Sequence, residues 1–87
     1  MAVIVEGYQN AELARFQQPG NADGLGQDSW IIDKHPADDY NVRYYNRAYE
    51  IRRQNNQRQG WVCGHLSLDD LVEMRDMLTK VIEAERE

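Results

Sequence analysis

The chain has 87 residues, a net charge of −5 and one cysteine, Cys63. A chain of this length forms one domain with a layer of helix on a layer of sheet, and it has little room for a buried catalytic pocket. One cysteine cannot form an internal disulfide, the negative charge disfavours general binding to polyanions, and no apolar run suits a membrane span or a signal peptide. We therefore expect a single cytoplasmic domain, residues 1–87, that is not an enzyme and has no cofactor.

Residues 1–29 are expected to form an N-terminal arm of uncertain structure. The segment Val3–Val5 is typical of a short strand, and residues 9–18 are weakly patterned for a turn or two of helix. Residues 18–29 contain three glycines, a proline and several turn-forming residues, which predicts a loop. We therefore place the sheet and the helix within residues 30–87.

Strand signals cluster after this loop. Apolar runs occupy residues 30–35, which end before a proline, and residues 60–66. Between them, residues 40–53 alternate apolar and polar side chains, but neither parity stays apolar throughout. A kink or tight turn near Asn46 would split this run into strands at about 40–45 and 47–53. The sequence thus predicts an antiparallel sheet of three to four strands.

The C-terminal segment, residues 67–84, is predicted to be an amphipathic helix that covers the sheet. Ser67 is a preferred N-cap residue, and Asp70 stands where the acid of a capping box would stand. Apolar residues then recur at steps of three and four, which gives one apolar stripe. The expected fold is therefore α+β. The stripe consists of Leu68, Leu71, Met74, Leu78, Val81 and Ile82.

No motif for catalysis or metal binding emerges. Asp33 and His35 alternate on one predicted strand, and Cys63 and His65 alternate on another. These four residues lack the paired spacings of structural zinc sites, and nothing marks an oxyanion hole beside Cys63. We therefore expect no metal site and no catalytic residues, with Cys63 buried and the two histidines at an edge or a turn.

Charge is segregated along the chain. Residues 1–40 carry seven acids and two bases, residues 41–65 carry five arginines and one acid, and residues 66–87 carry seven acids and three bases. Such an order can present one basic and one acidic face, or the charges can neutralise each other across the fold.

Between residues 40 and 53, tyrosines are interleaved with arginines, and this pattern has three interpretations. They can be protein-binding hot spots, stacking platforms for a nucleic acid, or a half-buried sheet covered by arginine stems. We hypothesise an inhibitor or regulator of a protein partner, able to form a homodimer because the sheet leaves a face or an edge to protect. The alternative is binding of single-stranded DNA or RNA through the Tyr/Arg strands. The candidate binding residues are Arg43, Tyr44, Tyr45, Arg47, Tyr49, Arg52, Arg53, Asp69, Glu73 and Asp76.

The chain resembles two kinds of known protein. The junction Gly60–Leu68, with short strands before it and one helix after it, resembles the transcriptional-coactivator type of single-strand-binding domain over roughly the last third of the chain. The lysines that such domains carry on the sheet are missing, since only Lys34 and Lys80 occur, so no function is transferred. In size and acidity the chain also resembles small phage-encoded proteins that block a host enzyme or defence complex.

Overall fold

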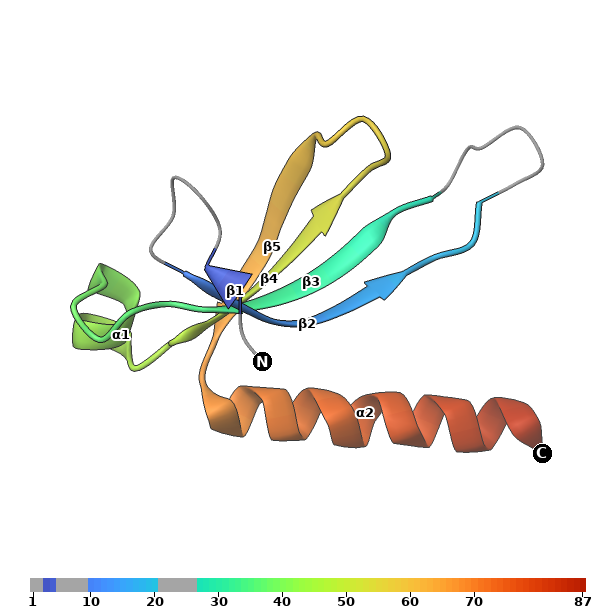
Figure 1. The fold of residues 1–87 in the computed structure, drawn as a ribbon. Helices are drawn as coiled ribbons and strands as arrows, with labels where there is room; N and C mark the ends of the chain where they lie inside the picture. The colour runs from blue at the N-terminus through green and yellow to red at the C-terminus, as the bar shows by residue number, and fades with distance from the viewer. Residues whose placement is uncertain (1–2, 5–9, 21–26) are drawn as a thin grey trace.

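The computed structural model describes residues 3–4, 10–20 and 27–87 of the chain (Figure 1). Its antiparallel sheet has the strand order β1-β2-β3-β4-β5, so that neighbours in sequence are neighbours in space. The predicted strands at 30–35, 47–53 and 60–66 correspond to β3, β4 and β5, and the α+β class is confirmed. The strands are β1 (Val3–Ile4), β2 (Ala11–Gln17), β3 (Ser29–Lys34), β4 (Tyr49–Gln54) and β5 (Gly60–Leu66).

The predicted strand at 40–45 is wrong, because this segment forms the short helix α1 (Tyr40–Tyr45). Asp39 caps the helix by accepting a hydrogen bond from the Asn41 backbone N–H at 2.9 Å. Asn46 ends it in the left-handed region, with φ of 53°, which Asn adopts more readily than most residues. The tight turn expected near Asn46 is therefore a helix terminus.

The weak helix predicted at 9–18 is also wrong, because residues 11–17 form β2 and pair with β3. In this register Ala14 lies opposite Ile32, and Phe16 lies opposite Trp30. A bulge between Glu12 and Ala14 interrupts the alternation along the strand, and such an interruption hides a strand from a period-two pattern. Part of the predicted loop, residues 21–26, lies outside the described residues.

The C-terminal helix α2 (Leu68–Arg86) agrees with the prediction and begins with a complete capping box. The Ser67 hydroxyl accepts from the Asp70 N–H at 3.1 Å, and the Asp70 carboxylate accepts from the Ser67 N–H at 3.0 Å. The hydrogen bond from the Ser67 backbone N–H, followed by a smaller contribution from the Ser67 side chain, lowers the pKa of Asp70 because it favours the charged carboxylate. The reciprocal pair satisfies two donors that the first helical turn would otherwise leave without partners.

Helix α2 runs along one face of the sheet (Figure 1). No residue of α2 is buried, and among the described residues Ile31 is the one buried hydrophobic side chain. None of the helices in the described ranges has the length and hydropathy needed to span a bilayer. The helix therefore lies over the sheet as predicted, but its side chains are not buried against the sheet.

The opposite face of the sheet is charged. Asp33 is 2% exposed and accepts a hydrogen bond from Arg52 Nε at 2.6 Å. Arg52 also lies 3.6 Å from Glu12, which accepts a 2.7 Å hydrogen bond from Arg15. The strand register brings these four charged residues together. Glu12 on β2 lies opposite Asp33 on β3. Arg15 on β2 and Arg52 on β4 both lie opposite Ile31, on either side of β3. This face of the sheet thus carries a cluster of ion pairs around the buried Ile31.

Replacing Ser67 with alanine tests the cap of α2. We expect Ser67→Ala to lower the free energy of unfolding by about 1 kcal/mol, because one N–H at the helix start loses its acceptor. Thr79→Ala, in the exposed middle of the same helix, is the control and should change stability little. Urea unfolding followed by far-ultraviolet circular dichroism measures both, and equal losses in the two variants would argue against a stabilising cap.

Replacing Glu12 with glutamine tests the charged face. The hydrogen bond from Arg15, helped by the charges of Arg15 and Arg52, lowers the pKa of Glu12 in the folded protein. Glu12 therefore stabilises the fold above about pH 4.5, its ordinary pKa, and this contribution is lost as the pH falls through the lowered value.

We expect Glu12→Gln to cost roughly 0.5 kcal/mol at pH 7 and to flatten the loss of stability below pH 4.5. Glu73→Gln, on the exposed surface of α2, is the matched control. Urea unfolding at a series of pH values compares the three proteins. Parallel curves for wild type and Glu12→Gln would contradict the assignment.

Candidate functional site

An apolar groove of about 690 Å³ lies between the sheet and α2. Cross-strand pairing builds its floor, since Phe16 lies opposite Trp30 and Ile32 lies opposite Ile51. Alternation along β3 places Trp30 and Ile32 on this face and Ile31 and Asp33 on the charged face. The sheet therefore separates an apolar groove from a charged surface.

Helix α2 supplies the other wall of the groove through Met74 and Leu78. The helical repeat of 3.6 residues puts Met77, Val81 and Ile82 on the same side as these two residues. These three and Leu78 are each about half exposed. The apolar stripe thus faces the groove but is not covered along its length.

Trp30, which lines the groove, lies beside an arginine and a second tryptophan on the neighbouring strands. The Arg53 guanidinium lies 4.6 Å from the ring centre of Trp61 and 6.0 Å from that of Trp30, within the range of cation–π attraction. Trp30 also donates from its indole nitrogen to the Gln18 side chain at 2.8 Å. Arg53 therefore ties β3 to β5 across the face that bears the groove.

The predicted Tyr/Arg strand surface does not exist as one continuous face. Arg43, Tyr44 and Tyr45 lie on α1, where Arg43 is 5.7 Å from the Tyr44 ring and the Tyr40 ring is 4.8 Å from that of Tyr44. Arg47 follows α1 and lies 5.9 Å from the Tyr45 ring. A hydrogen bond with Tyr45 raises the pKa of Tyr40. Helix α1 therefore presents an exposed cluster of aromatic and basic side chains.

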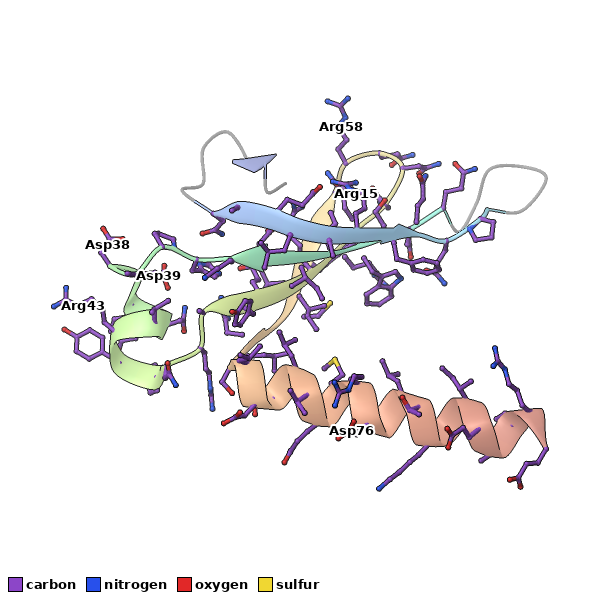
Figure 2. All side chains as sticks on the ribbon, turned by 60° about the horizontal axis from the view of Figure 1, so that its bottom comes forward. Arg15, Asp38, Asp39, Arg43, Arg58 and Asp76 are labelled. Carbon is purple, nitrogen blue, oxygen red and sulfur yellow. The ribbon has the colours of Figure 1, made fainter. Side chains whose placement is uncertain are left out.

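The remaining predicted residues lie on β4 and α2. Tyr49 and Arg53 share the face of the groove, whereas Arg52 belongs to the charged face with Asp33. Asp69, Glu73 and Asp76 are exposed on α2, and their spacing of four and three residues places them together on the side away from the apolar stripe. Figure 2 shows Arg15 and Arg58 on the far side of the sheet from α2, and Arg43 at α1.

Sequence reasoning missed the groove and one polar cluster. Phe16 belongs to the groove because it pairs with Trp30 across two strands, and a single sequence does not reveal which strands pair. Cys63, expected to be buried, is exposed and lines the groove. The two histidines come together with Glu50, and the three ligand atoms lie within 4.8 Å of one another, so these side chains could hold a metal ion.

The chain was compared with protein families, curated proteins and solved structures. No family model, no curated protein and no solved structure matches it. The geometry of its own residues therefore carries the functional argument.

Proposed function

We propose that this chain is a small, non-enzymatic, cytoplasmic binding protein that inhibits or regulates another protein and works as a homodimer. The observation that carries this proposal is the open apolar groove between the sheet and α2. Its lining is almost entirely hydrocarbon and offers no convergent polar groups of the kind that position a substrate. Apolar surface of this extent, bounded by charged faces, is typical of a protein–protein interface.

A second copy of the chain is the occupant that the surface fits best. The exposed part of the α2 stripe borders the open groove, so a two-fold axis would let the stripe of each copy contact the groove of the other. Six side chains of this face are between 36% and 60% exposed: Phe16, Trp30, Met77, Leu78, Val81 and Ile82. Their exposed surface is on the order of 600 Å² per chain, near the ~800 Å² per partner of a standard interface.

The small core supports the same conclusion. With Ile31 as the one buried hydrophobic residue among those described, a lone chain has little burial to offset its loss of conformational entropy. Burying the groove and the stripe would give the sheet a second apolar layer, as small domains require. Dimerisation is thus the proposed source of most of the fold's stability.

A dimer of this kind leaves the acidic side of α2 available for the regulated protein. Asp69, Glu73 and Asp76 point away from the stripe, and the Asp76 side chain is 58% exposed. Its neighbour Arg75 is bonded to it at 3.1 Å, so part of this charge is neutralised locally. A basic surface on the partner is the complement of the remaining negative charge.

The alternative, binding of single-stranded nucleic acid, has less support. A stacking platform needs aromatic residues and basic residues along one track. Here Tyr44 and Tyr45 are on α1, Trp61 is on β5 in contact with Arg53, and Arg52 is neutralised by Asp33. The positive charge is dispersed over several surfaces, and the net charge is −5.

Replacing Leu78 with glutamate tests the dimer. We expect Leu78→Glu to weaken self-association by about 2 kcal/mol, or roughly 30-fold in the dissociation constant, because a charge would enter an apolar interface. Thr79→Glu is the matched control, since it adds the same charge one position further round the helix, away from the stripe. Sedimentation equilibrium over a range of concentrations measures both.

The wild type and Thr79→Glu should sediment as dimers under conditions where Leu78→Glu is monomeric or unfolded. A wild type that stays monomeric and folded at high micromolar concentration would contradict the homodimer. Equal dissociation constants for the two glutamate variants would remove the groove from the interface.

Reversing the charge of α2 tests the regulated partner. We expect the triple variant Asp69→Lys, Glu73→Lys, Asp76→Lys to lose a protein that the wild type captures stoichiometrically from host lysate, because the contact is electrostatic. The control replaces Arg43 on α1 and Arg47 just after it with glutamine and should retain capture. Capture followed by mass spectrometry at moderate salt is the measurement, and recovery of nucleic acid alone would contradict the proposal.

A further inference from the structure

We propose that His35, Glu50 and His65 form a binding site for a divalent transition metal, with zinc as the best match. The three residues come from different segments that the sheet brings together. His35 directly follows β3, and its backbone N–H donates to the Ala48 carbonyl just before β4 at 2.7 Å. Glu50 on β4 and His65 on β5 are direct partners in the register of those strands. The sheet therefore fixes all three positions through main-chain hydrogen bonds.

The distances among the ligand atoms suit a metal. Glu50 Oε1 lies 3.3 Å from His35 Nε2 and 3.3 Å from His65 Nε2. Ligands on a tetrahedral zinc ion with bonds of 2.0–2.1 Å are about 3.3–3.4 Å apart. The third separation, between the two imidazole nitrogens, is at most 4.8 Å. Closing it takes a movement of about 1.5 Å at most, and His65, whose side chain is 31% exposed, has room to move.

An unsatisfied nitrogen points to the same ligand. His35 is 9% exposed, yet its Nε2 has no hydrogen-bond partner among the described residues, although Glu50 Oε1 is within 3.3 Å. The two atoms are close but not aligned as donor and acceptor. A buried nitrogen without a partner costs free energy, and a metal ion would satisfy it. Glu50, 7% exposed, would gain a cation beside its buried carboxylate.

Asp39 supplies the outer contact that metal-binding histidines usually have. Its Oδ1 lies 3.5 Å from His35 Nδ1, on the other side of the ring from Nε2. A proton held on Nδ1 toward this carboxylate leaves the Nε2 lone pair for the metal. The Asp39 Oδ2 atom is held by the Asn41 N–H at the start of α1. The helix cap and the orientation of the imidazole thus depend on one side chain.

The donor set selects the class of metal. Two imidazoles and a carboxylate suit zinc and its neighbours in the first transition series better than calcium or magnesium, which prefer oxygen ligands alone. Three protein ligands leave a fourth position for water or for a group from a partner. Each site lies within one chain and on the charged face of the sheet, so it does not depend on the proposed dimer.

The test is a titration of the full chain, made without a polyhistidine tag, with Zn²⁺ alone. Isothermal calorimetry and competition with a chromophoric chelator give stoichiometry and affinity, and Co²⁺ in place of Zn²⁺ gives a visible spectrum sensitive to tetrahedral geometry. We expect one ion per chain and a melting temperature that rises with Zn²⁺ concentration, because the ion binds only the folded state.

Four variants identify the ligands. His65→Ala and Glu50→Gln should weaken binding at least about 100-fold, since even the loss of an outer contact costs 10- to 100-fold. Asp39→Asn should weaken it about 10-fold while keeping the helix cap, because asparagine caps as well as aspartate. Cys63→Ser, which alters the exposed thiol, should bind as the wild type does.

Three results of these experiments would contradict the proposed metal site. Absence of binding by the wild type, unchanged affinity in His65→Ala, or loss of binding in Cys63→Ser would each overturn the site. Circular dichroism of each variant without metal shows whether it is folded. If His65→Ala unfolds, the Co²⁺ spectra of wild type and Glu50→Gln decide, because a lost carboxylate ligand changes the absorption bands and an unaltered spectrum would contradict the site.

Discussion

An ion pair enclosed between two strands sets the layout of this molecule. Arg52 on β4 reaches Asp33 on β3 at 2.6 Å, and Asp33 is almost fully buried. Desolvation offsets much of the attraction in such a pair, so its clearest effect is on register. A slip of β3 by one residue would send Asp33 to the other face, away from Arg52, and carry Trp30 and Ile32 away from the groove. The pairing register of β3 and β4 therefore determines both the charged face and the apolar groove.

The apolar face is the basis of the proposed homodimer. α2 brings its stripe beside the sheet without burying it, and the sheet turns Phe16 and Trp30 to the same space. The Arg52–Asp33 and Arg15–Glu12 pairs lie on the other side of the sheet, and the acidic residues Asp69, Glu73 and Asp76 lie on the outer side of α2. This distribution is what the proposed homodimer requires: an apolar surface to bury and an acidic surface left outside.

The sequence predicted what depends on local signals. The cap at Ser67, the regular stripe of α2 and the apolar runs of β3 and β5 specify their structures within a few residues. It failed where the deciding contact is distant, as for β2, whose strand character comes from pairing with β3 across a bulge. Residues 40–45 misled because their alternating tyrosines resemble a strand, while Asp39 and Asn46 provide the two ends of a helix. The His35, Glu50 and His65 cluster could not be predicted, since its members are neighbours only through the sheet.

The meander order of the strands bears on how the chain reaches its structure. Each of the strands β2 to β5 pairs with the strand before it, so every hairpin can close from contacts near in sequence, which favours rapid folding. The helix comes after all five strands along the chain, and during synthesis the apolar face of the sheet waits for it. A nascent chain in that interval exposes Phe16 and Trp30 to other copies emerging from the same message. If the proposed homodimer forms, its assembly on the ribosome would compete directly with aggregation.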